Sequence, residues 1–150
     1  MRTRILARSL IAFVSLVAAA SPCAADWPQF RGPEGDGLSA TEGLPVRWSE
    51  TEGVAWKTPI PGLGWSSPVV QGGRVYLTTA VPQGDGQSLR LVCVDARTGA
   101  VQWNKEVFAQ DATAKMHAKN SHASPTPIVT GDAVFVHFGP HGTARTTLDG

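Results

Sequence analysis

Cysteine is scarce in this sequence, which contains only Cys23 and Cys93. Cys23 lies in an N-terminal segment that we expect to be removed, so the mature chain keeps Cys93 alone. One cysteine cannot form an internal disulfide, even in the oxidising compartment to which the chain is expected to be exported. The sequence therefore excludes a disulfide-stapled domain.

The sequence also has no apolar run suited to crossing a membrane. The apolar stretch at residues 10–20 contains 11 residues, whereas a spanning helix needs about 20. It follows the arginine-containing residues 1–9 and precedes several small residues, which is the pattern of a secretory signal peptide. We predict a signal peptide over residues 1–25, with cleavage after Ala25, and a periplasmic or secreted mature protein.

Two alternatives to cleavage exist for this leader. One is a membrane anchor, which the short apolar run disfavours. The other is lipid attachment at Cys23, which Pro22 directly before it disfavours. Removal of residues 1–25 leaves 10 basic and 12 acidic residues, a net charge of −2. Because no clustered basic face is evident, we expect no nucleic-acid partner. Because the apolar run is short, we expect no stable membrane span.

Helical periodicity is not evident after residue 25. Short segments instead alternate apolar and polar residues and end at Gly, Pro or Asp, which is typical of strands. Glycine-containing turns at residues 71–73 and 130–132 predict two hairpins, because glycine takes a positive φ without steric cost. The predicted strands are 54–58, 67–70, 74–79, 89–94, 101–108, 127–129 and 133–138.

The two hairpins are copies of one another. Residues 67–77 align without gaps on residues 126–136. A second pair of similar segments surrounds Trp56 and Trp103, which lie 47 residues apart. The hairpins are separated by a longer interval, and the surplus falls around residues 109–122. We infer a repeat of about 47 residues with an insertion between two units.

A repeat of this length with four strands per unit is typical of β-propeller blades. The fold predicted is all-β: an incomplete β-propeller of four-stranded antiparallel blades, with one complete blade and parts of two others. We divide the chain into the signal peptide, an N-terminal strap at 26–53, and propeller repeats at 54–150. Since propellers close with about four to eight blades, we expect this chain to be the N-terminal part of a longer protein.

The most informative short stretch, residues 92–103, joins two predicted strands. Asp95 ends the first strand, and Thr98 and Gly99 reverse the chain. Asp and Thr side chains hydrogen-bond nearby backbone groups and so hold a turn. Trp103, on the following strand, is large enough to cover a neighbouring blade. The pattern indicates a structural joint.

The Asp-x-x-Thr-Gly-x-x-x-Trp pattern from Asp95 to Trp103 resembles the tryptophan-docking motif of the pyrroloquinoline quinone (PQQ)-like β-propeller repeat family. Residues 67–76 resemble that family's inner hairpin, and residues 27–33 resemble the segment after the signal peptide in an exported subgroup. The resemblance implies that the motif tryptophan packs between adjacent blades. Trp56 follows a degenerate copy that lacks the aspartate.

Three functions are compatible with this resemblance, because the fold carries several. The first, which we favour, is a non-catalytic exported binding or scaffold module, as in the scaffold lipoprotein of the outer-membrane barrel-assembly machine. The second is part of a PQQ-dependent oxidoreductase. The third is a propeller that binds a polysaccharide or small ligand. Expected partners are proteins or further blades of the same propeller.

No catalytic residue is assigned in this chain. The resemblance implies that alcohol-type quinoproteins hold PQQ under a vicinal cysteine pair and calcium on Glu, Asn and Asp. No residue here matches that set, so PQQ and calcium are expected only if absent blades supply their ligands.

Other polar or aromatic residues have simpler interpretations. The four histidines have spacings that match no tight zinc pattern, so loop or packing roles are favoured over a metal site. The residues are His117, His122, His137 and His141. Glu34 and Asp36 do not fit an EF-hand and indicate a turn-rich strap. Trp65 is interpreted as core or rim packing, with the floor of a ligand pocket as the alternative, and Ser66 has no catalytic partner.

Overall fold

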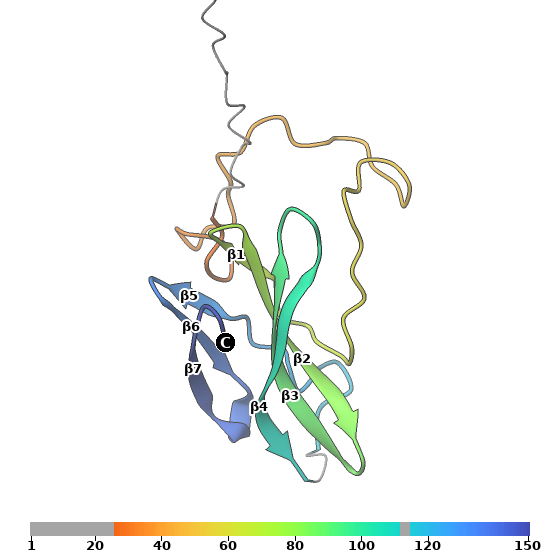
Figure 1. Cartoon of the computed structure of the whole chain (residues 1–150), viewed down its shortest axis with the longest axis vertical. Helices are drawn as coiled ribbons and strands as arrows, with labels where there is room; N and C mark the ends of the chain where they lie inside the picture. Colours follow the sequence, from red (N-terminus) through yellow and green to blue (C-terminus); the bar gives the residue numbers. More distant parts are fainter. Residues whose placement is uncertain (1–25, 112–114) are drawn as a thin grey trace, which may run out of the picture.

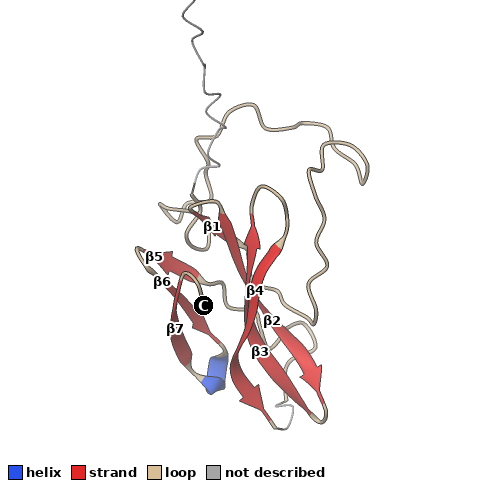
Figure 2. Cartoon of the chain, in the orientation of Figure 1, coloured by secondary structure: helices blue, strands red, loops and turns tan. Residues whose placement is uncertain are grey.

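The computed structural model describes residues 26–111 and 115–150, and these form an all-β structure with a single 3₁₀ turn (Figure 2). The predicted signal peptide lies outside the described residues. The strands form a four-stranded sheet in the order β1-β2-β3-β4 and a three-stranded sheet in the order β5-β6-β7 (Figure 1). The elements are β1 (Val69–Gln71), β2 (Arg74–Gln83), β3 (Gly86–Asp95), β4 (Val101–Gln110), β5 (Ile128–Thr130), β6 (Ala133–His137), η1 (Gly139–His141) and β7 (Thr143–Thr147).

The four-stranded sheet is a complete antiparallel blade, and the three-stranded sheet is part of another. Both predicted hairpins are confirmed. Val69 pairs with Tyr76 in the first, and Ile128 pairs with Phe135 at the equivalent positions of the second. The sequence repeat is therefore also a repeat of strand register.

Three features of the strands differ from the prediction. Residues 54–58 form no strand, because no neighbouring strand lies beside them in the described part of the chain. Strand β7 was not predicted, because its sequence TARTT lacks the large apolar residues that make an alternating pattern visible. The β2–β3 hairpin is longer than expected and closes by pairing Gln83 with Gly86.

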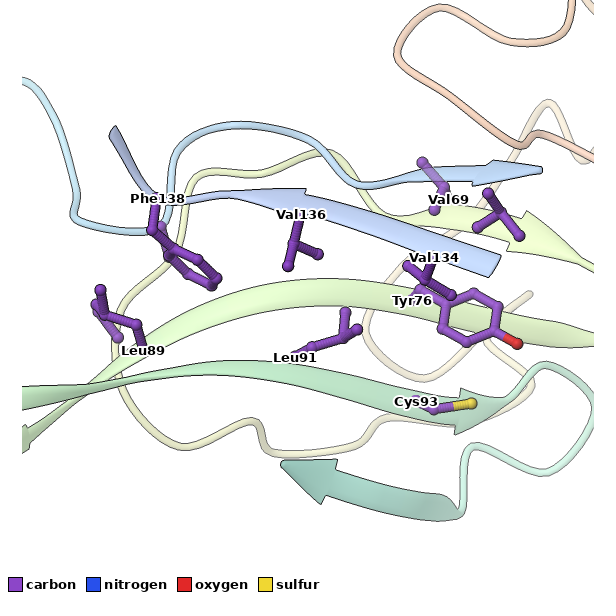
Figure 3. Close-up of a cluster of buried hydrophobic side chains, with 11 residues drawn as sticks. Val69, Tyr76, Leu89, Leu91, Cys93, Val134, Val136 and Phe138 are labelled. Carbon is purple, nitrogen blue, oxygen red and sulfur yellow. The ribbon is translucent and has the colours of Figure 1, made fainter. Parts of the chain in front are cut away.

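The hydrophobic core lies between the two sheets. Leu89, Leu91 and Cys93 alternate along β3 and face the second sheet, and all three are fully buried. Figure 3 shows Val134 and Val136 of β6 directed at this face. Burial of each such aliphatic side chain contributes about 1.5–3 kcal/mol, so the two sheets stabilise one another through a shared apolar layer.

The first residues of the strap connect the two sheets through backbone hydrogen bonds. Trp27 exchanges two backbone hydrogen bonds with Val70 of β1, at 2.7 and 2.9 Å, and the Pro28 carbonyl accepts the Val129 N–H of β5 at 2.8 Å. The first strands of the two blades are therefore bridged by adjacent strap residues. Within the described residues, no helix is long and apolar enough to cross a membrane.

Candidate functional site

The turn after β3 is organised by one carboxylate oxygen. Asp95 Oδ1 accepts the backbone N–H groups of Arg97 and Thr98, at 3.1 and 2.7 Å, and the Thr98 hydroxyl at 2.8 Å. The Thr98 hydroxyl in turn accepts the Ala100 N–H at 3.3 Å. The hydrogen bonds that Thr98 donates are the main reason that the pKa of Asp95 lies below its usual value. Asp95 and Thr98 therefore act together in shaping the turn.

The tryptophan that contacts this turn is Trp56. Its indole N–H donates to the Ala96 carbonyl at 3.0 Å, and the Thr58 hydroxyl donates to the Gly99 carbonyl. Gly99 has a φ of +74°, and a Cβ there would lie 2.6 Å from Cδ2 of the indole. Gly99 is thus required both by the backbone conformation and by the close approach of Trp56.

Trp103 occupies a different environment on β4. It pairs with Cys93 across the β3–β4 ladder, and its ring lies 6.0 Å from that of Tyr76. Its indole nitrogen is buried and has no hydrogen-bond partner among the described residues. The structure therefore brings Asp95, Thr98, Gly99 and Trp56 together and places Trp103 apart from them.

The thiol beside Trp103 is unreactive in character. Cys93 is fully buried, and this burial is the largest cause that raises its pKa to about 11. Burial also raises the pKa of Tyr76. Because a thiolate is the reactive form, Cys93 is suited to packing at the centre of the core.

Three of the four histidines line one cavity of about 330 Å³: His117, His122 and His141. The fourth, His137, lies elsewhere, and its Nδ1 is 3.0 Å from the Thr143 hydroxyl. The sequence favoured loop or packing roles for these histidines over a metal site. Among the residues that the structure describes, no group of three or more His, Cys, Asp or Glu side chains is arranged to hold a metal ion.

Trp65 is not a core residue, since 64% of its surface is exposed. It lines a smaller cavity of about 80 Å³ that shares His122 with the first. The core interpretation is therefore wrong for Trp65 in this structure, whereas a place at the rim fits. Ser66 has a structural contact, because its hydroxyl accepts the Thr78 N–H at 3.1 Å.

The acidic strap residues support local turns. The Asp36 carboxylate accepts the Leu38 N–H at 2.9 Å, and the Arg31 guanidinium donates to the Asp36 carbonyl at 2.8 Å. Glu34 is exposed and makes no contact with them that defines a cation site. The geometry agrees with a turn-rich strap.

Comparison with known proteins gives the family. The family model described as outer membrane protein assembly factor BamB matches residues 35–150. The search of curated proteins found no match. The match covers both sheets and most of the strap, and it agrees with the hairpin and turn patterns described above. The chain belongs to this family of PQQ-like β-propeller repeats.

Proposed function

We propose that this protein is an exported, non-catalytic propeller module that binds other proteins in the periplasm or outside the cell. The proposal rests on one observation: the polar groups of the motif are engaged in structural hydrogen bonds. Asp95 Oδ1, the Thr98 hydroxyl and the Trp56 N–H all bond within one turn. Groups bound in this way hold the fold, so the most distinctive motif of the chain supports assembly rather than chemistry.

The family relationship supports a protein as the binding partner. The matching family is described by an outer-membrane protein assembly factor, and such a role requires protein-protein contacts. Exposed apolar side chains on the strap suit such contacts, since Trp48 is 75% and Val46 is 94% exposed. We assign Trp56 and Trp103 as the residues that join one blade to the next, in keeping with the family motif.

Export is tested by expressing the full chain with a C-terminal tag in a Gram-negative host. We expect the tagged protein in the periplasm or medium, with an N-terminus at Asp26 or within a few residues of it. A cytosolic product that retains Met1 would contradict export.

The non-catalytic role is tested with PQQ and calcium. We expect no saturable binding of either by the purified chain in calorimetry, and no substrate-dependent reduction of an artificial electron acceptor after mixing with both. Stoichiometric PQQ binding together with such reduction would favour the oxidoreductase alternative.

The proposed partner role is tested by photo-crosslinking in the cell envelope. A photo-reactive residue at position 48, on the strap, is expected to give a discrete adduct with an envelope protein, while the same residue at position 132, in the second hairpin turn, gives none. Equal labelling at the two positions would argue against a specific partner surface.

A further inference from the structure

The cavity lined by His117, His122 and His141 is built where the second repeat departs from the first. In the first blade, the β2–β3 hairpin continues to the pair Gln83 and Gly86. In the second, pairing of β6 with β7 ends at His137 and Thr143, and η1 fills the turn. The segment that faces η1 across the cavity belongs to the insertion before β5. One wall is therefore an addition to the repeat, and the other is a shortened hairpin closed by η1.

Residues 120–124, at the end of the insertion and just after it, are held by the segment that leads into β1 and by their own hydrogen bonds. The buried Ala123 carbonyl accepts the backbone N–H groups of Trp65 and Ser66, at 3.1 and 3.2 Å. Within the loop, Asn120 Oδ1 accepts the Ser121 N–H at 2.9 Å, and the Ser121 and Ser124 hydroxyls lie 3.0 Å apart. These contacts make the wall of the cavity an ordered part of the fold.

Two imidazole nitrogens in this cavity are buried without a partner. Nε2 of His122 and Nε2 of His141 have no hydrogen-bond partner among the described residues. Buried polar atoms are nearly always hydrogen-bonded, so an orphaned one requires an explanation such as a ligand. Here the two histidines that carry these atoms come from separate segments and line the same cavity.

The polar lining of the cavity is rich in donors. Lys115 and the three histidines line it, and no Asp or Glu appears among its described lining residues. Nδ1 of His117 accepts the Lys119 N–H at 3.1 Å, so the proton of the neutral ring is on Nε2. A space with ammonium and imidazole donors and without carboxylates is complementary to an oxyanion.

Part of the remaining lining is apolar, beside the polar side chains of Asn120, Ser121 and Ser124. Phe138 lines the cavity and is held edge-on against Phe108, with ring centroids 6.0 Å apart at 84°. Met116 and Pro125 also line it. A cavity of about 330 Å³ lies at the small end of the range for ligand pockets, about 300–1,000 Å³.

We propose that this cavity binds a small organic acid, which places a carboxylate or phosphate on His122 and His141 and an apolar body against Phe138. The site is independent of the proposed protein-binding role, because it uses the loop and η1 rather than the strap. Its ligand would be recognised by charge and size, with no bond made or broken.

The test is calorimetric titration of the full chain, at constant ionic strength, with phenyl phosphate, benzoate and the neutral analogue benzyl alcohol. We expect saturable binding of at least one of the two anions and none of the alcohol. The better anion distinguishes phosphate from carboxylate as the natural group. Binding of neither anion, or equal binding of the alcohol, would overturn the proposal.

Variants locate the site. We expect His122→Leu and His141→Leu each to weaken anion binding by about tenfold or more, as for loss of a hydrogen bond to a charged group. His137→Leu is the matched control, since its ring lies outside the cavity, and it should leave the affinity unchanged. Equal weakening by all three variants would contradict the assigned site.

A spectroscopic measurement keeps the proposal testable if a variant fails to fold. In the unmodified chain with ¹⁵N-labelled histidine, the anion should shift the Nε2 resonances of His122 and His141 and leave those of His137 in place. Unchanged His122 and His141 resonances at saturating anion would show that the cavity holds ordered water alone and would overturn the proposal.

Discussion

Trp56 and Trp103 hold equivalent places in two successive repeats, yet their surroundings differ. The Trp56 indole is bonded to the Ala96 carbonyl and lies against Gly99. The Trp103 indole nitrogen is buried without a partner among the described residues. The turn built by Asp95 and Gly99 therefore receives the tryptophan of the preceding segment, not the one that follows it in the motif.

The residues that form the motif in the sequence are therefore not the same as the residues that contact one another in the structure. Along the chain, the motif runs from Asp95 to Trp103. In space, its turn is completed by Trp56, which comes 39 residues before Asp95. In a repeat protein, each unit contacts only its neighbours. Each interface is therefore formed by residues from two successive units, as it is here by Trp56 and the Asp95 turn.

The largest expected effect comes from Gly99→Ala, which should disrupt the Trp56 joint. The new Cβ would lie 2.6 Å from the indole at a residue with φ of +74°. We expect a loss of about 3 kcal/mol in the free energy of unfolding, from left-handed strain of about 1–2 kcal/mol and overpacking of about 1–3 kcal/mol. Denaturant unfolding followed by tryptophan fluorescence measures it.

The matched control is Gly131→Ala in the second hairpin. Gly131 also has a positive φ, +54°, but a Cβ there meets nothing within 4 Å. It should cost only the strain, about 1–2 kcal/mol. Equal losses at the two glycines would show that the contact with Trp56 contributes nothing.

The second prediction concerns Cys93, which pairs with Trp103. Burial raises the pKa of its thiol from 9.0 to about 11. As pH rises through this window, the unfolded chain loses the thiol proton before the folded chain does. The free energy of unfolding should therefore fall by about 2 kcal/mol between pH 9 and pH 11, because the thiol proton is bound more tightly in the folded chain.

Cys93→Ala separates this thiol from other groups that titrate at high pH. Tyr76, whose pKa is also raised, remains in both proteins. The variant should lose the part of the alkaline decline that belongs to Cys93, as measured by unfolding at closely spaced pH values. Parallel curves for the two proteins would contradict the prediction.

The third prediction compares the two indoles directly through Trp56→Phe and Trp103→Phe. Both changes remove the same volume, but only the first leaves a carbonyl, that of Ala96, without its donor. The second removes a buried N–H that has no partner in the described part of the chain. Trp56→Phe should therefore cost about 1 kcal/mol more in the free energy of unfolding.

Thermal and denaturant unfolding of the two phenylalanine variants, side by side, provides the measurement. A larger loss for Trp103→Phe would mean that the Trp103 indole N–H has a partner of its own. It would also remove the distinction on which the comparison of the two sites depends.

The smallest expected effect is an acid dependence at Asp95. Hydrogen bonds from Thr98 lower the pKa of this carboxyl, so its contribution is present above its unfolded pKa of about 3.9 and is lost as pH falls through the folded value. Asp95→Asn should flatten the decline in stability below pH 4. Asp132→Asn, in the second hairpin turn, is the control and should preserve that decline.

The sequence by itself determined the local structure of the two copied hairpins. Alternation and glycine turns specify hairpins through interactions between near neighbours, so residues 67–77 and 126–136 could be aligned and their shared register confirmed. The same reasoning missed β7, whose polar sequence has no apolar face. It also assigned a strand at residues 54–58, although a strand requires a partner that alternation cannot supply.

Only the tertiary structure decided which residues meet across long distances. It placed Trp56, rather than Trp103, on the Asp95 turn, and it brought His117, His122 and His141 to one cavity from two segments. The spacing of these residues contains no sign of either outcome. Such contacts depend on how whole sheets and loops pack, which short-range propensities do not encode.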